Sequence, residues 1–269
     1  MNKFIMKIFK KRYLIMGCLL AALVVILSVV VLVFYTGNNS DDIVDNPDYD
    51  NSESLTSSQS GLLNGDSTFL LVGNGKKPGE IIFMTLVEFR IYSESIIVTP
   101  LSYDTDVSGS TYGEYYAYGG ISMLKNAVEN TRQCKIDRYV VVDEDGFCDI
   151  VDMMGKVPVT VNEEFTYISS DKSYVVSVGD NEFESPMLYS YIKVIAAKNN
   201  PELLADLLCT VINEYMPSVD SADAQEYFEV LCNYVNTDLS IADYYSCSAD
   251  IAHLIDSETV CIPYYKGEQ

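Results

Sequence analysis

The segment IDRYVVVDEDGFCDIVDMMGKVPVTV, residues 136–161, decides the fold class of this chain. Its two ends are rich in β-branched residues and predict strands over 136–142 and 157–161. Between them, Asp143 can cap a helix that runs to Met154, and Gly155 suits the C-terminal end of that helix. A strand, a helix and a strand in this order are typical of an α/β fold.

The flanking segments extend this pattern in both directions. Towards the N-terminus, apolar runs predict strands over 68–72, 81–89 and 95–101, and helical spacing of apolar residues predicts a helix over about 120–132. Towards the C-terminus we expect a strand over 174–178, helices that begin near residues 186, 201, 221 and 241, and a last strand over 259–262. The fold class that follows is α/β, with a mixed central sheet flanked by helices.

A glycine-rich loop, GNGKKPG at 73–79, joins the first two predicted strands. A dinucleotide site requires the spacing G-x-G-x-x-G and a helix after it, whereas here the third glycine is one residue late and a β-branched run follows. The sequence therefore excludes a Rossmann site. Lys76 and Lys77 are expected at a hairpin tip.

The charge of the chain excludes several classes of function. The 39 acidic residues outnumber the 17 basic ones, which gives a net charge of -22. Nucleic acid is therefore not an expected partner, because such binding depends on Lys and Arg. The single histidine, His253, excludes a zinc site built on two histidines, and any Ser-His-Asp triad would have to use it.

The N-terminal segments predict membrane attachment. Residues 13–35 carry no charge and are long enough to cross a bilayer, and all five basic residues before them lie within residues 1–12. This distribution predicts a cytoplasmic N-terminus, a signal anchor over 13–35, an acidic disordered stalk over 36–65 and an extracytoplasmic domain over 66–269. A cleaved signal peptide is the alternative, although no A-x-A-like cleavage site follows the apolar run.

Six cysteines follow the apolar segment, and one more, Cys18, lies within it. Export permits disulfides without requiring them. Most of the six occupy apolar periodic positions, which favours small buried side chains, with disulfides as the alternative. No CxxC or CxH spacing indicates a metal or redox centre.

Several motifs, in order and at matching spacing, give the exported part a family resemblance. They are FLLVG at 69–73, IVTPLSYDTDV at 97–107, YAYGG at 116–120, AVEN at 127–130, IDRYVVV at 136–142 and VDMMGKVPV at 151–159. Over about residues 66–265 the chain resembles the LytR-CpsA-Psr proteins, which are membrane-anchored enzymes of the bacterial cell envelope. The resemblance implies transfer of glycopolymers from a polyprenyl pyrophosphate carrier to peptidoglycan, with the prenyl chain in a tunnel between sheet and helices.

The chain departs from the family where a pyrophosphate would bind. The family's first acid lies in a G-x-D that here reads Gly73-Asn74-Gly75, and its second acid falls on Ile81 or Ile82. The arginine of its P-R-D-T motif falls on Tyr103, and its later arginine pair is replaced by the run 191–195, which contains only Lys193. Both Mg²⁺ carboxylates and most of the arginines are therefore missing, and no metal-binding residue is predicted.

The residues that remain from the family's site are the candidates for function. Asp104, Thr105 and Lys193 are the candidate ligand-binding residues, with a plain turn cap as the alternative for the first two. For the YAYGG segment the expectation is a structural role at a helix entry, and it concerns Tyr116, Tyr118, Gly119 and Gly120. No catalytic residue is assigned.

Three functions remain open from the sequence. The first is a degenerate member that binds a polyprenyl-linked glycopolymer, peptidoglycan or a protein partner without catalysis. The second is an active, Mg²⁺-dependent phosphotransferase whose cations come from other positions: Lys76, Lys77, Arg90, Lys125 or Lys193. The third is a structural exoprotein held by disulfides.

Overall fold

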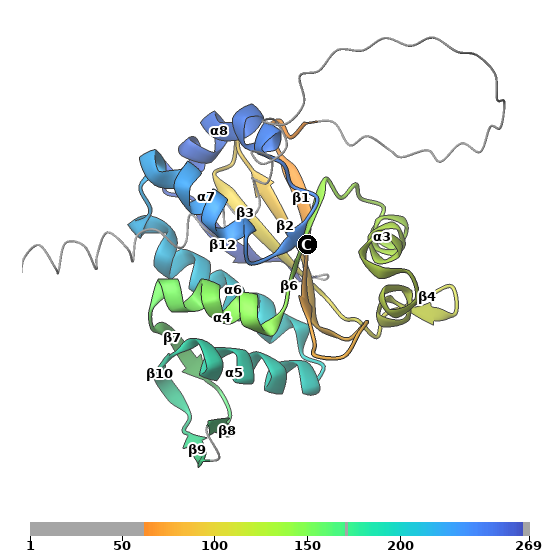
Figure 1. Cartoon of the computed structure of the whole chain (residues 1–269), viewed down its shortest axis with the longest axis vertical. Coiled ribbons are helices and arrows are strands. Elements are labelled where there is room, and N and C mark those ends of the chain that lie inside the picture. Colours follow the sequence, from red (N-terminus) through yellow and green to blue (C-terminus); the bar gives the residue numbers. More distant parts are fainter. Residues whose placement is uncertain (1–61, 170–171, 266–269) are drawn as a thin grey trace, which may run out of the picture.

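A computed structural model describes residues 62–169 and 172–265 (Figure 1). Within them, six strands form one sheet in the order β11 (Asn236–Thr237), β6 (Arg138–Val142), β1 (Ser67–Asn74), β2 (Ile81–Arg90), β3 (Ser95–Leu101) and β12 (Val260–Pro263). β1 pairs in parallel with β6, and β3 with β12, whereas the other neighbours are antiparallel. The predicted mixed central sheet is confirmed.

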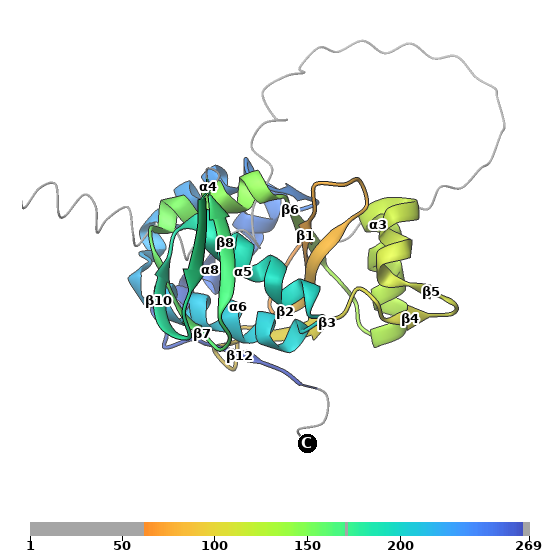
Figure 2. The same ribbon diagram turned by 90° about the horizontal axis from the view of Figure 1, so that it is seen from below.

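Helices cover both faces of this sheet. The described helices are α3 (Tyr112–Arg132), α4 (Glu144–Met154), α5 (Ser185–Ala197), α6 (Pro201–Tyr215), α7 (Ala224–Cys232) and α8 (Ile241–Asp256). Figure 2 separates α3 from α4, α5 and α6, with β1 and β6 between them. The domain therefore has three layers, as an α/β fold requires.

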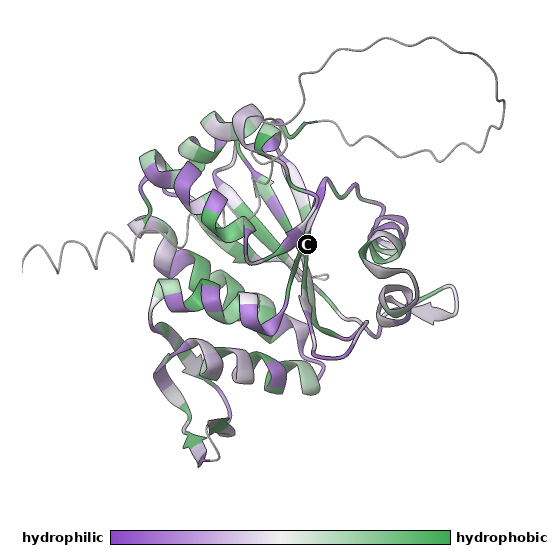
Figure 3. Ribbon diagram, viewed as in Figure 1, coloured by the Kyte–Doolittle hydropathy of each residue, from purple (hydrophilic) through white to green (hydrophobic). Residues whose placement is uncertain are grey.

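Alternate residues of β1 divide the core into two parts. Phe69 and Leu71 point into the larger apolar cluster, beneath the helices α4 to α8. Leu70 and Val72 point into a smaller cluster beneath α3. A strand covered on both faces reads as a continuous apolar run, which is why the sequence predicted it clearly. In Figure 3 the central strands and much of α6 are green, the colour of hydrophobic residues.

Local capping signals place two helices where the sequence predicts them. The carboxylate of Asp143 accepts a 2.8 Å hydrogen bond from the Gly146 amide at the start of α4. The side chain of Asn200 accepts one of 3.0 Å from the Leu203 amide at the start of α6. Each cap satisfies a backbone donor that has no partner within its helix, so the start of the helix is fixed by a few neighbouring residues.

The start of α3 was predicted wrongly. The sequence predicts a helix from about Gly120, but α3 begins at Tyr112, where Thr111 and Glu114 form a capping box. Gly120 instead interrupts the helix, with φ of 64° and ψ of -159°. A side chain is strained at that φ, so glycine permits a kink between two helical halves. The YAYGG segment therefore lies inside α3 and across this kink.

The small strands were predicted less well than those of the central sheet. The strand predicted over 174–178 is β9 (Lys172–Val176), which pairs with the unpredicted β8 (Phe165–Ser169). A second ribbon pairs β7 (Val157–Val161) with β10 (Gly179–Phe183), and a third pairs β4 (Asp106–Val107) with β5 (Ser110–Thr111). Two 3-10 turns, Met216–Ser218 and Ser221–Asp223, precede α7, so the helix expected near residue 221 begins at Ala224.

A buried ion pair joins the first described residues to the C-terminal helix. Arg138 and Asp243 are 3% and 0% exposed, and the Arg138 Nε lies 3.0 Å from an Asp243 oxygen. The Leu63 amide donates to the same carboxylate at 3.2 Å, and the Ser246 hydroxyl donates to the Leu63 carbonyl at 2.7 Å. Leu63, which falls within the predicted stalk, is 5% exposed and belongs to the packed domain.

The predicted signal anchor over 13–35 and most of the predicted stalk lie outside the described residues. In residues 62–169 and 172–265, no helix combines the length and the apolar character that a bilayer span requires.

Candidate functional site

Two tyrosine hydroxyls converge on Asn74, the last residue of β1. The Tyr116 hydroxyl, from α3, donates to the Asn74 side-chain oxygen at 2.6 Å. The Tyr189 hydroxyl, from α5, donates to the Asn74 carbonyl oxygen at 3.1 Å. Helices from the two faces of the sheet therefore meet at one residue. We call Asn74, Tyr116, Tyr189 and Lys193 the Asn74 cluster.

The loop between β1 and β2 brings Asn74 to α3. The Gly75 amide donates to the Glu80 carbonyl at 2.9 Å and closes the loop, and the pairing register shifts at Gly73/Asn74. Gly79, at φ 76°, lies against α3, where an added Cβ would be 2.7 Å from the Cα of Ala117. Only glycine allows this approach without displacing backbone. The loop thus lies beside Ala117 and its neighbour in sequence, Tyr116.

Lys193 supplies the positive charge of the cluster. It follows Tyr189 by one turn of α5, and its amine lies 5.7 Å from the centre of the Tyr189 ring, a distance suited to a cation–π contact. Among the described residues, no carboxylate lies within ion-pair distance of this exposed amine. Lys193 is therefore available to an anionic ligand.

Burial and nearby acids keep the cluster's phenols protonated. Burial raises the pKa of Tyr189 above its ordinary value of 10, and Glu144, Cys148, Asp143 and Glu80 raise it further. Burial also raises the pKa of Tyr116, against a smaller lowering by its hydrogen bond to Asn74. Both side chains are neutral near pH 7, and the acids make the surroundings of Tyr189 negative.

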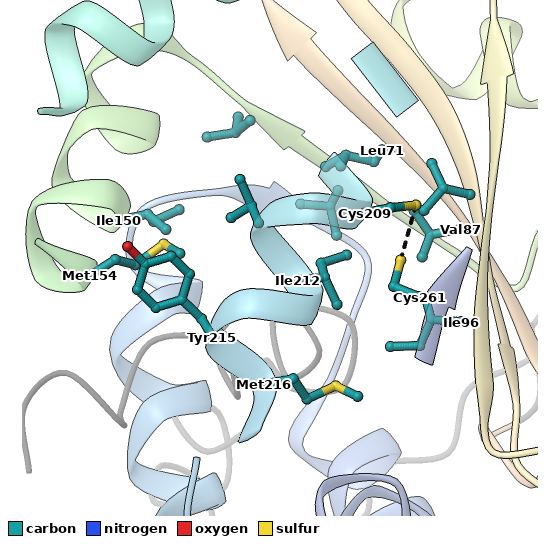
Figure 4. Close-up of a cluster of buried hydrophobic side chains, with 14 of the residues drawn as sticks. Leu71, Val87, Ile96, Ile150, Met154, Cys209, Ile212, Tyr215, Met216 and Cys261 are labelled. Atoms are coloured by element: carbon teal, nitrogen blue, oxygen red, sulfur yellow. Dashed lines mark hydrogen bonds between the residues drawn. The ribbon is translucent and has the colours of Figure 1, made fainter. Parts of the chain in front are cut away.

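An apolar cavity of about 90 Å³ lies between the sheet and the helices α4, α5 and α6. Leu188 and Ile192 line it from α5, beside Tyr189 and Lys193 in sequence. Phe147 lines it from α4, and its ring centre is 5.4 Å from that of Tyr189. Figure 4 shows Leu71, Ile150 and Met154, which also line the cavity, among the buried side chains. The cluster does not itself line the cavity, but Tyr189 contacts Phe147, which does, and the cluster holds one unpaired cation.

The family model described as the LytR_cpsA_psr family matches residues 96–261, well over half of the chain. The chain belongs to this family. The expected resemblance is therefore confirmed over β3 to β12. Asn74 and the loop after it precede the matched residues.

Individual relatives agree with this assignment. The chain is 33% identical over 115 residues to the polyisoprenyl-teichoic acid–peptidoglycan teichoic acid transferase TagV of Bacillus subtilis. The match covers 34% of the chain and 29% of TagV, so it spans less than a third of that curated relative. The crystal structure of B. subtilis TagV gives a TM-score of 0.60 at 18% identity, covering 76% of this chain and 86% of that one. The crystal structure of a Eubacterium siraeum protein gives a TM-score of 0.63 at 15% identity, covering 82% of this chain and 93% of that one. These structures show a shared fold.

The candidates from the family's P-R-D-T motif lie in a turn. The Thr105 amide donates to the Ser102 carbonyl at 3.1 Å, and the Tyr112 amide donates to the Thr105 carbonyl at 3.2 Å. Asp104 is exposed. No described hydrogen bond or ion pair joins Asp104 or Thr105 to Lys193, so the structure does not bring these three candidates into direct contact. Tyr103 does reach α5, where its hydroxyl donates to the Ala196 carbonyl at 3.4 Å.

The YAYGG residues have different environments. Tyr116 is half-buried and binds Asn74, whereas Tyr118 is 86% exposed. Gly119 and Gly120 form the kink region of α3. Sequence reasoning placed Tyr116 in a helix entry, and it did not predict that Tyr189 joins it. The spacing of Tyr189 and Lys193, four residues apart on a predicted helix, was the available signal.

Most of the alternative cations are engaged elsewhere. Arg90 pairs with Glu88 and lies 3.8 Å from Asp66, at the end of β2 opposite the loop. Lys125 lies 3.9 Å from Asp238. Lys76 lies 3.3 Å from Glu144 beside the cluster, so its charge is balanced there. These pairings leave Lys193 and the exposed Lys77 as candidates.

The residues present do not fit the family's magnesium ion. The first acid position holds Gly75, which has no side chain, and the side-chain oxygen of the preceding Asn74 already accepts from Tyr116. The second falls on Ile81 or Ile82, and Ile81 is 8% exposed within the core. Across the two described ranges, no group of three or more His, Cys, Asp or Glu side chains is arranged to hold a metal ion. Mg²⁺ requires oxygen ligands, and the side chains at these two positions supply none.

Proposed function

We propose that the domain binds a polyprenyl-linked glycopolymer carrier without transferring the polymer. The prenyl chain would enter the apolar cavity, and the diphosphate would lie at the Asn74 cluster. A ligand of this class has an apolar chain and an anionic head, and the cavity and Lys193 are complementary to those two parts. The transferase name of TagV indicates the same class of substrate.

The polar contacts available to a diphosphate are few. Lys193 can pair with one phosphate oxygen, and no described residue accepts a hydrogen bond from the Asn74 side-chain amide, which can donate to another. These contacts would orient an anionic head beside Tyr189, which contacts the cavity residue Phe147. They form a binding site with a single full positive charge.

The same contacts argue against transfer. A phosphoryl transition state is stabilised by several cations, and the loss of one such contact typically costs about 10²- to 10³-fold in rate. Lysine is a point charge that cannot replace the planar fork of arginine. In addition, Glu80, Asp143 and Glu144 lie close enough to raise the pKa of Tyr189, and they would oppose developing negative charge. The observation that carries the proposal is an apolar cavity whose lining residue Phe147 contacts Tyr189, in a cluster with one unpaired cation.

We also propose that residues 13–35 anchor the chain with the domain outside the membrane. The five preceding basic residues and the absence of charge in this run support that orientation. An anchor would keep the domain close to a carrier lipid. A full polyprenyl chain is larger than a 90 Å³ cavity, so α4, α5 or α6 would move outward on binding.

Two measurements, retention of the lipid and release of phosphate, distinguish binding from transfer. Full-length protein in detergent is incubated with a polyprenyl diphosphate glycopolymer, Mg²⁺ and peptidoglycan fragments. We expect the lipid to be retained, with no phosphate release above the protein-free background. Turnover comparable with that of an active family member would establish the transferase alternative. Absence of retention would refute the binding function.

A pair of variants on α6 tests the cavity. Ala205 lines it and is 2% exposed, so Ala205→Phe fills space that the prenyl chain requires. Glu202 is exposed on the same helix, and Glu202→Gln is the matched control. We expect Ala205→Phe to lower lipid retention at least tenfold and Glu202→Gln to leave it unchanged. Thermal unfolding of each variant checks that the domain remains folded.

A further inference from the structure

Two buried thiols face each other where α6 crosses β12. The sulfur atoms of Cys209 and Cys261 are 3.3 Å apart, and the residues are 4% and 2% exposed (Figure 4). They come from positions 52 residues apart in the chain. A sulfur pair this close needs a further approach of little more than 1 Å to reach the bond length of about 2.05 Å in a disulfide.

The backbone around the two thiols is held in register. Asn213, one turn after Cys209, donates its side-chain amide to the Cys261 carbonyl at 2.7 Å and accepts from the Cys261 amide at 2.7 Å. On its other side, β12 pairs with β3, with Cys261 opposite Ile96. β12 is thus hydrogen-bonded to α6 on one side and to β3 on the other. These bonds fix the face of α6 that Cys261 contacts.

We propose that Cys209 and Cys261 form a disulfide that fixes α6 to β12. The oxidant is a disulfide of the thiol–disulfide exchange class, such as oxidised glutathione or a disulfide oxidoreductase. One cysteine thiolate attacks the donor disulfide and releases one donor thiol, and the second cysteine then displaces the other. Two cysteine thiols are oxidised, and one donor disulfide is reduced to two thiols. The extracytoplasmic location proposed above supplies such oxidants.

The bond forms during folding rather than after it. The hydrogen bond to Cys209 and then burial raise the pKa of the Cys261 thiol above its ordinary value, so the reactive thiolate is scarce in the folded domain. While α6 and β12 are still assembling, both thiols are accessible to a donor. Once formed, the bond is buried and resists reduction.

The disulfide also bears on the apolar cavity. Ala205, Leu208 and Val211 line the cavity from α6, whereas Cys209 on the same helix contacts β12. Fixing α6 to the sheet leaves α4 and α5 as the elements that move when a long apolar chain enters. The pairing of the cysteines itself does not depend on any ligand.

Mass spectrometry of full-length protein in detergent tests the pairing. The protein is unfolded and refolded in a buffer of oxidised and reduced glutathione, and free thiols are then alkylated. Trypsin is unsuitable, because residues 199–265 contain no Lys or Arg and four cysteines would stay in one peptide. Chymotrypsin cleaves after aromatic residues such as Tyr215 and Tyr244, and so separates Cys209 from Cys261. We expect a cross-linked peptide pair that contains these two cysteines.

Thermal unfolding with and without reductant provides a second readout. A disulfide closing this loop should raise the unfolding midpoint by about 5–15 °C. Cys209→Ala and Cys261→Ala should abolish both the cross-link and the reductant-sensitive shift, and Cys134→Ala, the matched control, should retain both. Quantitative alkylation of Cys209 and Cys261 in refolded wild-type protein, or pairing of either one with another cysteine, overturns the proposal. The wild-type measurement decides the outcome even if a variant fails to fold.

Discussion

The hydroxyl of Tyr116 and the side-chain oxygen of Asn74 are hydrogen-bonded at 2.6 Å. This bond joins the YAYGG segment to the residue just before Gly75, the loop position where the family carries an acid. The acid is thus replaced by a glycine, and the oxygen of the neighbouring amide is already used by a phenol. The cluster is a hydrogen-bonded junction between α3, β1 and α5.

Removing the Tyr116 hydroxyl should weaken the junction. We expect Tyr116→Phe to lower the free energy of unfolding by about 0.5–1.5 kcal/mol, the usual contribution of one hydrogen bond, as measured by urea denaturation. Tyr118→Phe is the control, because Tyr118 is 86% exposed. An equal effect of the two substitutions would contradict the role given to Tyr116.

Lys193 should govern the affinity for a diphosphate head group. We expect Lys193→Gln to weaken binding of a polyprenyl diphosphate about tenfold or more, because a charged hydrogen bond is lost. Lys193→Arg should retain binding. The control is Lys172→Gln, on the exposed strand β9. Equilibrium binding in detergent measures all three, and unchanged affinity in Lys193→Gln would remove this residue from the site.

Adding one acid beside the position of the missing one should not create catalysis. In Asn74→Asp, Tyr116 can still donate to the new carboxylate, but the added charge lies close to Glu80 and Glu144. We expect diphosphate binding to fall without Mg²⁺ and to recover partly with it, and phosphate release to stay at background because Lys193 remains the cluster's unpaired cation. Turnover by this single variant would show that one added acid is enough for the chemistry and would contradict the proposed loss of catalysis.

The buried ion pair of Arg138 and Asp243 should be essential for stability. Asp243→Leu leaves a buried guanidinium without its carboxylate, and we expect a loss of about 3–5 kcal/mol in the free energy of unfolding. Arg138→Met combined with Asp243→Leu should recover part of that loss. For the exposed pair of Arg90 and Glu88, Glu88→Gln should cost no more than about 1 kcal/mol. Similar losses in Asp243→Leu and Glu88→Gln would be incompatible with a buried pair.

Asp238 should make the free energy of unfolding depend on pH in the acid range. Burial raises its pKa above the ordinary 3.8, against smaller lowering effects of Tyr139, Lys125 and Arg138. The folded state therefore binds this proton more tightly than the unfolded state, so this contribution to stability is present at low pH and is lost as pH rises from 3.8 through the folded-state pKa. Asp238→Asn should remove that part of the pH dependence, and the exposed Asp145→Asn should not. Urea denaturation at several pH values between about 3 and 6, a range that begins below the ordinary pKa of 3.8 and extends above it, measures it.

The fold was predictable where local signals and buried strands coincide. Asp143 and Asn200 cap their helices through neighbouring residues, and β1 is apolar because both of its faces are covered. The start of α3 was not predictable from apolar periodicity, because its first turns are rich in Tyr and Gly and the decisive signal is the reciprocal pair Thr111 and Glu114. Short ribbons such as β8 and β9 depend on each other for pairing, and each buries only one of its described side chains fully, Phe165 and Val176, which is too weak a pattern to mark a strand.

Only the types of residue in the site, and not their contacts, could be predicted from the sequence. The sequence indicated a shortage of cations and placed Lys193 among the surviving candidates. It could not show that Tyr189 reaches Asn74 across 115 residues, because that contact depends on how α5 lies over the sheet. Asp104 and Thr105 were singled out by motif, yet a turn at the start of α3 separates them from the cluster's hydrogen bonds.

The first described residues are held by α8 through three hydrogen bonds: Leu63 to Asp243, Ser246 to Leu63 and Gly65 to Asp250. Tension applied at Leu63 would thus be transmitted to α8 and, through Asp243 and Arg138, to β6 beside the edge strand β11. The cavity helices α4, α5 and α6 lie off this line of force. A mechanical load on the first described residues would therefore bypass the apolar cavity.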